Sequence, residues 1–194
     1  MYIVFDTETT GLPKNYSASA EDSANWPHIT QLSYAVFNEF GEPIKFVNHL
    51  IKPKGWTVPK EKFFIDNNMS TERCEAEGID IEIALEEFIT DRMNAKYSIG
   101  HNISFDSKII RAEMFRNNRR EEFTSPKICT MMKSTNYCAI LTDKSNKFKW
   151  PKLQELHKKL FGAEFEGAHD AFDDVQATAK CFFELVNRKV IVLE

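Results

Sequence analysis

The chain has 194 residues, of which 42% are hydrophobic and 28% charged. This size and composition predict one globular domain over residues 1–194 and exclude a disordered or fibrous protein. The N-terminus lacks the basic region and apolar run of a signal peptide, and no apolar stretch reaches the roughly 18 residues of a membrane span. We therefore expect a cytoplasmic protein with no membrane partner.

The formal net charge is −4, but the charge is unevenly distributed. Residues 97–160 contain 13 Lys and Arg against 6 Asp and Glu, so this middle segment is basic within an acidic chain. Such a segment is suited to a phosphate-binding face. A solvated helix surface, balanced by acidic neighbours in the fold, explains the composition equally well.

The first half of the chain predicts three strands. Residues 2–7 are apolar and β-branched, whereas residues 12–27 are rich in Ser, Ala and Asn and predict a long loop. Residues 29–37 alternate in polarity, and after a turn residues 44–51 resume an extended pattern, which indicates a hairpin. The first three strands are therefore expected to be antiparallel neighbours.

Helices and short strands alternate in the rest of the chain. Two short helices are expected within residues 59–77, and a longer helix over 80–93, capped by Asp80. After these come strands at 97–100 and 126–130 and helices at 104–117, 153–161 and 170–186. In the helix at 104–117, four residues are expected to face inward: Phe105, Ile109, Ala112 and Phe115. This order predicts an α/β domain with a mixed sheet.

Four cysteines form no C-x-x-C pair, which disfavours a zinc ribbon or a dithiol redox site. We expect reduced and mostly buried thiols at Cys74, Cys129, Cys138 and Cys181.

Two carboxylates lie two residues apart at the end of the first predicted strand. Asp6 and Glu8 share one face of that strand, because side chains alternate along it. Two acids this close repel each other unless one is protonated or a cation lies between them, and Mg²⁺ or Mn²⁺ is the natural oxygen-bound cation. Solvated surface charge is the alternative for this pattern on its own.

Two further acids follow at helix starts. Asp106 lies in the first turn after Gly100-His101-Asn102, where it could also complement the helix dipole, and His101 is expected to be a hydrogen-bonded junction residue. In the last helix Asp170 and Asp173 have the spacing of a cap and a dipole partner. Asp174 is not needed for capping.

His169 precedes the last helix, next to these acids, and is a candidate general base. The blocks D-T-E-T-T-G-L, G-H-N-x-x-F-D and H-x-A-x-x-D, in this order, resemble the DEDD superfamily of 3′→5′ exonucleases. The histidine places the resemblance in the DEDDh branch, which includes the proofreading epsilon subunit of bacterial DNA polymerase III. The resemblance spans nearly the whole chain and implies a ribonuclease H-like fold with a mixed five-stranded sheet flanked by helices.

The resemblance also implies a mechanism. Four acids would hold two divalent metal ions, Mg²⁺ or Mn²⁺: Asp6, Glu8, Asp106 and Asp174. His169 would accept the proton of the attacking water, Glu8 would share in catalysis, and the products would be nucleoside 5′-monophosphates. Contacts to the terminal nucleotide are expected from Thr9, Gly11, Leu12, Asn102 and Phe105, although Leu12 and Phe105 could instead be core residues.

Two segments depart from the minimal family pattern: the long loop over residues 12–27 and the segment 140–150. The segment 140–150 carries Lys144, Lys147 and Lys149 around Phe148. These lysines could contact the phosphates of a nucleic-acid strand, or they could belong to an ordinary surface loop. No tail for a polymerase or clamp follows Glu194, so we expect a freestanding enzyme or a subunit recruited through its own surface.

Single-stranded nucleic acid is the expected partner, DNA rather than RNA, with a homodimer and polymerase or repair proteins as further candidates. An exoribonuclease or oligoribonuclease and a non-catalytic nucleic-acid-binding module of the same fold are the alternatives.

Overall fold

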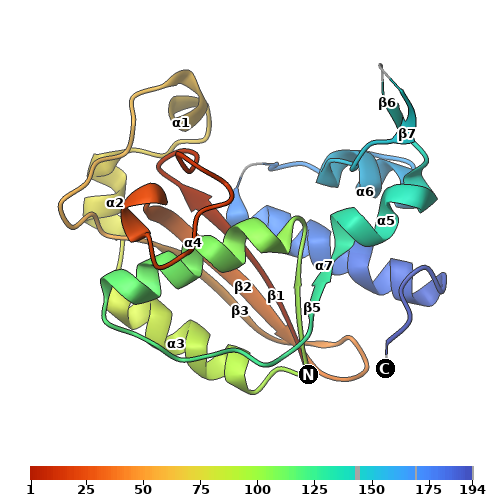
Figure 1. Ribbon diagram of the computed structural model, residues 1–194, viewed down its shortest axis with the longest axis horizontal. Coiled ribbons are helices and arrows are strands. Elements are labelled where there is room, and N and C mark those ends of the chain that lie inside the picture. The colour runs from red at the N-terminus through yellow and green to blue at the C-terminus, as the bar shows by residue number, and fades with distance from the viewer. Residues whose placement is uncertain (143–144, 169, 194) are drawn as a thin grey trace.

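The computed structural model of the protein describes residues 1–142, 145–168 and 170–193. Its main sheet has five strands in the order β3-β2-β1-β4-β5 (Figure 1). The strands are β1 (Tyr2–Thr9), β2 (Ile29–Phe37), β3 (Pro43–Leu50), β4 (Tyr97–Gly100) and β5 (Lys127–Cys129). The first three strands are antiparallel, whereas β4 pairs parallel with both β1 and β5. The expected mixed five-stranded sheet is therefore confirmed.

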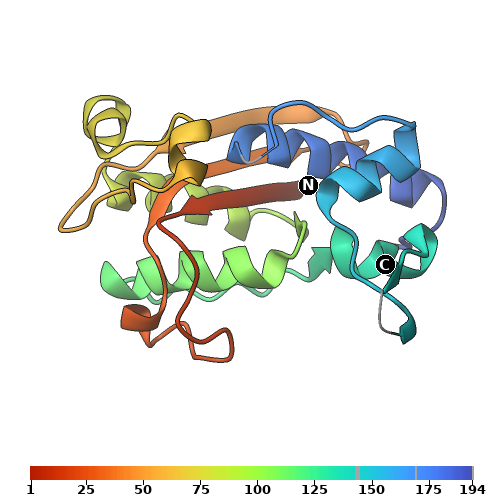
Figure 2. The same ribbon diagram turned by 90° about the horizontal axis from the view of Figure 1, so that it is seen from above.

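Helices cover both faces of the sheet. They are α1 (Lys62–Asp66), α2 (Thr71–Glu77), α3 (Ile81–Met93), α4 (Ile103–Arg116), α5 (Thr130–Cys138), α6 (Leu153–Phe161) and α7 (Ala171–Asn187), with a 3₁₀ turn at Ser23–Asn25. Figure 2 shows α4 and α7 on opposite sides of β1. Near α5 and α6 the short strands β6 (Leu141–Thr142) and β7 (Ser145–Phe148) form a separate hairpin.

The alternation of side chains along β1 divides the core into two layers. Ile3 and Phe5 pack with α3 and α4, and the rings of Phe5 and Phe88 meet edge to face with centroids 5.2 Å apart. Val4 packs in the other layer with residues of α7 such as Val175. Asp6 therefore continues the α7 face of the strand, and so does Glu8. The buried strand thus carries both acids to one end of the sheet.

The structure corrects several local expectations. Asp80 precedes α3, but its side chain accepts no capping hydrogen bond. Phe115 is half-buried, lying against the guanidinium groups of Arg111 and Arg120 instead of in the core. The strand expected over residues 126–130 is shorter, because Thr130 begins α5. Neither α5 nor the β6–β7 hairpin was expected, since both sequences are polar and short.

The expected state of the cysteines is confirmed. All four cysteines are free thiols; three of them are buried and Cys129 is half-buried. In the described ranges, no helix combines the length and the apolar composition that crossing a membrane requires.

The long loop over residues 12–27 is attached to α4 through Arg116. This guanidinium donates hydrogen bonds to the carbonyl oxygens of Ser23, Trp26 and Pro27 and forms an ion pair with Glu113, at 2.7 Å. The side chain of Arg116 is 17% exposed. The loop is thus an ordered part of the domain.

We expect Arg116→Met to lower the free energy of unfolding by about 2 kcal/mol, because it removes charge-assisted hydrogen bonds to the loop and takes one partner from the buried Glu113, which keeps its contacts to His28 and to the backbone N of Ile29. Denaturant unfolding measures this loss, and limited proteolysis should show faster cleavage within residues 12–27. Arg73→Met, which alters an exposed ion pair on α2, is the matched control. Equal proteolysis of both variants would contradict the role of Arg116.

Candidate active site

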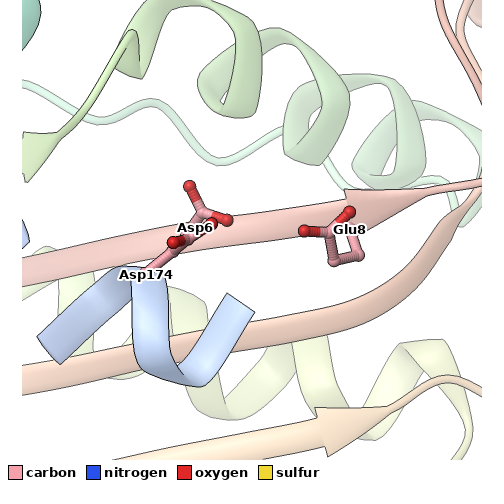
Figure 3. A group of neighbouring side chains, drawn as sticks. All are labelled: Asp6, Glu8 and Asp174. Carbon is pink, nitrogen blue, oxygen red and sulfur yellow. The ribbon is translucent and has the colours of Figure 1, made fainter. Parts of the chain in front are cut away.

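Three carboxylates from two distant parts of the chain meet at the end of β1. Asp6 and Glu8 project from the strand, and Asp174 projects from the first turn of α7 (Figure 3). Each offers an oxygen atom, and these oxygens all lie within 4.8 Å of one another. All three residues are half-buried. We refer to them below as the acidic cluster.

The acidic cluster is electrostatically strained. Burial raises the pKa of Asp6 well above its usual value, and the negative charges of Asp106, Asp174 and Glu8 raise it further. Burial also raises the pKa of Glu8 to about 8, with contributions from Asp174 and Asp106. Near neutral pH the cluster must therefore either keep protons or bind a cation. Hard carboxylate oxygens at this spacing fit a divalent cation such as Mg²⁺ or Mn²⁺.

Asp106 lies beside the acidic cluster and is held in place by β1. β4 pairs with β1 only as far as Val4 with Ile99, so beyond this point the β4 side of β1 is an open edge. There Thr7 donates two hydrogen bonds to Asp106 Oδ1, from its backbone N at 3.1 Å and from its Oγ1 at 2.8 Å. Burial raises the pKa of Asp106 to about 7, against the lowering effect of the bonds from Thr7.

We expect Thr7→Val to lower metal affinity or activity about tenfold, because the hydroxyl that orients Asp106 is lost while the shape of the side chain is kept. Metal titration and the rate of oligonucleotide digestion measure the effect. Thr90→Val, which removes a hydroxyl bonded to Glu86 O on α3, is the control. An unchanged metal affinity and rate in Thr7→Val would show that this contact does not position Asp106.

The start of α7 is fixed by a network that presents Asp174. Asp170 caps the helix by accepting a hydrogen bond from Phe172 N at 2.9 Å, as expected. Gln31, buried on β2, donates to Asp170 Oδ2 at 3.2 Å and accepts from Ala171 N at 3.3 Å. The sequence reasoning missed Gln31; a glutamine among the apolar residues of a central strand was the available signal.

Asp173 lies outside the acidic cluster, as its expected structural role requires. Its carboxylate lies against Gly167, where an added Cβ would be only 2.0 Å from Asp173 Oδ2. Gly167 also has a φ of +80°, so both space and backbone conformation require glycine there.

Both histidine predictions concern the surroundings of this site. His101 is confirmed as a junction residue, because its ring nitrogens lie 2.9 Å from Thr130 Oγ1 and 3.0 Å from Pro151 O. Burial lowers the pKa of His101 to about 4, so the ring is neutral near pH 7. His169, the expected general base, lies outside the described residues, and its role stays a prediction.

The expected nucleotide contacts lie on two segments at the same edge of the sheet. Gly11 and Leu12 follow β1, and Asn102 and Phe105 follow its parallel neighbour β4. Leu12 is 73% exposed, so the alternative that Leu12 is a core residue is wrong. An added Cβ at Gly11 would meet no atom within 4 Å, and its φ is +146°.

The other nucleotide candidates have local structural roles. Thr9 is buried and donates from its hydroxyl to Gly11 O at 2.7 Å. Asn102 takes a left-handed conformation at the start of α4, and Phe105 is half-buried against the core. Their contacts to a nucleotide stay predictions.

The segment 140–150 forms the β6–β7 hairpin and its flanks. Lys144 lies outside the described residues, and Lys149 pairs with Glu155 at 2.6 Å. Phe148 and Trp150 are exposed. A phosphate contact by this segment stays a prediction.

A mixed five-stranded sheet with clustered acids at the end of its central strand defines a nuclease of ribonuclease H-like fold. The sequence profile of the exonuclease family (RNase T) matches residues 3–182, so the chain belongs to this family of the DEDD superfamily. No curated protein sequence matches the chain.

Several solved structures share the fold. Exonuclease I of E. coli in complex with a dA16 oligonucleotide is 17% identical, with a TM-score of 0.72 over 97% of this chain and 41% of that chain. The exonuclease I from Methylocaldum szegediense is 18% identical, with a TM-score of 0.70 over 97% and 40% of the two chains. A zinc-bound E. coli exonuclease I–single-stranded DNA complex is 19% identical, with a TM-score of 0.72 over 97% and 41%. The chain thus spans about two-fifths of their length, and the likeness shows the fold.

Proposed function

We propose that this protein is a two-metal-dependent 3′→5′ exonuclease that hydrolyses single-stranded DNA from its 3′ end and releases nucleoside 5′-monophosphates. The observation that supports this most strongly is the convergence of Asp6, Glu8 and Asp174 within 4.8 Å, beside Asp106. A binding module would gain nothing from clustered acids that repel phosphate.

Each residue of the site has a role in this proposal. Asp6, Glu8 and Asp174 hold divalent metal, Mg²⁺ or Mn²⁺, and Asp106 completes the set from the open edge of β1. Bound metal would activate water and neutralise charge on the leaving 3′ oxygen. His169 accepts the proton of the attacking water, which assigns the protein to the DEDDh branch.

DNA is the proposed substrate because oligodeoxynucleotides occupy the exonuclease I complexes that share this fold. RNA is the second candidate, since no contact in the described structure distinguishes the sugar. Thr9, Gly11, Leu12, Asn102 and Phe105 are proposed to hold the terminal nucleotide. Residues 1–194 are proposed to form one exonuclease domain, similar to the epsilon subunit and located in the cytoplasm. Its proposed pathway is DNA proofreading or repair. Its proposed protein partners are a DNA polymerase or a second copy of the same chain.

Digestion of 5′-end-labelled oligonucleotides tests the proposal. Matched single-stranded DNA and RNA are incubated with Mg²⁺, with Mn²⁺ and with chelator. We expect a metal-dependent ladder of products shortened from the 3′ end, with DNA cleaved faster. A 3′-terminal phosphorothioate should slow the first cut. Intact substrates in every condition would favour the non-catalytic alternative.

The same assay tests the proposed base. His169→Ala should slow the metal-dependent ladder about 10²- to 10⁴-fold, the usual contribution of a general base. His157→Ala, on α6, is the comparison: this buried histidine bonds to Ala163 O instead of facing the acids. Metal binding should be unaffected in His169→Ala, and a full rate in that variant would remove the histidine from the mechanism.

A further inference from the structure

A pocket of about 340 Å³ lies on the side of β1 opposite the acidic cluster. Arg92 of α3 lines it, and the guanidinium of Arg92 lies 5.0 Å from the ring centre of Phe5. Because Phe5 and Asp6 point to opposite faces of β1, the pocket is separate from the nuclease site. Its other walls are α4, Ala20 of the loop over residues 12–27, the segment that leads into β5, and Lys127 at the start of that strand.

Arg92 is a buried cation without a counter-ion. The residue is 2% exposed, and its guanidinium is surrounded by the rings of Phe5, Phe88 and Phe123, the last at 4.0 Å. Its Nε and Nη2 atoms are buried and form no hydrogen bond within the described residues. Aromatic faces offset part of the cost of burying this charge, but they leave the N–H bonds of these two nitrogen atoms without acceptors. Burial, with the nearby charge of Arg111, lowers the pKa of Arg92 only to about 10, so it remains a cation.

Further donors line the same pocket. Ser107 is buried, and its Oγ has no hydrogen-bond partner in the described ranges. Lys108 Nζ donates to Tyr16 O at 2.8 Å, and Arg111 donates to Glu121 O. Lys127 reaches the pocket from β5.

The charge of the lining is unbalanced. Arg92, Lys108, Arg111 and Lys127 face a single acid, Glu122. None of these four cations forms an ion pair with a carboxylate in the part of the chain that the structure describes. Partial burial lowers the pKa of Lys127, and the charges of Arg92 and Arg111 lower it further. An anion in the pocket would relieve this repulsion.

We propose that this pocket is an anion site for a phosphoryl group, bound by Arg92, Lys127 and Ser107. A phosphoryl group carries up to two negative charges and three acceptor oxygens, which suit a guanidinium, an ammonium and a hydroxyl. The pocket lies within the size range of small-molecule sites, at the lower end, so a mononucleotide or free phosphate fits it. A phosphate of the nucleic-acid backbone has the same chemistry. The inference is independent of the proposed exonuclease activity.

Titration calorimetry tests the proposal with three probes: inorganic phosphate, dTMP and an oligo-dT strand. All titrations contain chelator and are held at constant ionic strength, so no hydrolysis occurs and bulk charge screening is equal. We expect saturable binding to the wild type and at least about tenfold weaker binding to Lys127→Gln, the effect of losing one charged hydrogen bond. Lys158→Gln, an exposed lysine of α6 outside this pocket, should bind as the wild type does.

The probes separate the two sources of phosphate. Binding of phosphate or dTMP that depends on Lys127 identifies a small-molecule site, whereas Lys127-dependent binding of oligo-dT alone identifies a backbone contact. Arg92→Met should abolish either kind of binding. If Arg92→Met does not fold, Ser107→Ala replaces it as the test, because it changes a smaller side chain, and it should weaken the binding. The proposal is overturned if no probe binds, or if Lys127→Gln and Ser107→Ala both bind as tightly as the wild type.

Discussion

Asp6→Asn should lower metal-dependent hydrolysis at least about 10³-fold, which corresponds to about 4 kcal/mol of transition-state stabilisation. The substitution keeps the size of the side chain but removes one of the three carboxyl groups whose oxygen atoms converge within 4.8 Å. Single-turnover digestion of end-labelled DNA measures the loss. Asp174→Asn should behave similarly, because its carboxylate closes the same cluster from α7.

The neighbouring acid Asp173 provides the matched control, since it lies on the same turn of α7 but outside the acidic cluster. Asp173→Asn should retain activity within a fewfold of the wild type. In metal-free protein, Asp6→Asn should also raise the free energy of unfolding, because it relieves the repulsion that raises the pKa values of the cluster. A variant that lost activity together with stability would point to misfolding and contradict a role in metal binding.

The strongest sequence predictions came from periodicity. The apolar start of β1 and the two-residue spacing of Asp6 and Glu8 placed both carboxylates on one face of a strand end, as the structure has them. The strands Ile29–Phe37 and Tyr97–Gly100 and the helix Leu153–Phe161 have the bounds that their patterns predicted. These elements obey local rules of burial and alternation, so a single sequence suffices to find them.

The contacts that complete the site are not local, and the sequence could not show them. Thr7 and Asp106 are 99 residues apart, and their bond depends on where the pairing of β4 with β1 ends. Gln31 reaches Asp170 across 139 residues. From the sequence, Arg92 is an ordinary basic residue in the last turn of a helix. Only the packing of three aromatic rings around its guanidinium makes it a buried cation.

The second large effect concerns stability and pH in the metal-free protein. We expect the free energy of unfolding to fall by about 3 kcal/mol as the pH rises from about 4.5 to 8, since each pKa unit is worth about 1.4 kcal/mol and solvent screens part of the shift. The sign follows from Glu8: its pKa is 4.5 ordinarily and about 8 in the folded protein. Between these values the folded protein keeps a proton that the unfolded chain has released, so raising the pH favours unfolding.

Denaturant unfolding at several pH values, with chelator, measures this dependence. Glu8→Gln should flatten it, whereas Glu75→Gln, an exposed residue of α2, should not. Saturating Mg²⁺ or Mn²⁺ should restore stability in the wild type above pH 7, by about 2.7 kcal/mol at 100 times the dissociation constant, and should do less for Glu8→Gln. A metal-free protein that gains stability over this pH range would mean that Glu8 is ionised without cost, and the electrostatic reason for a metal at the cluster would then be lost.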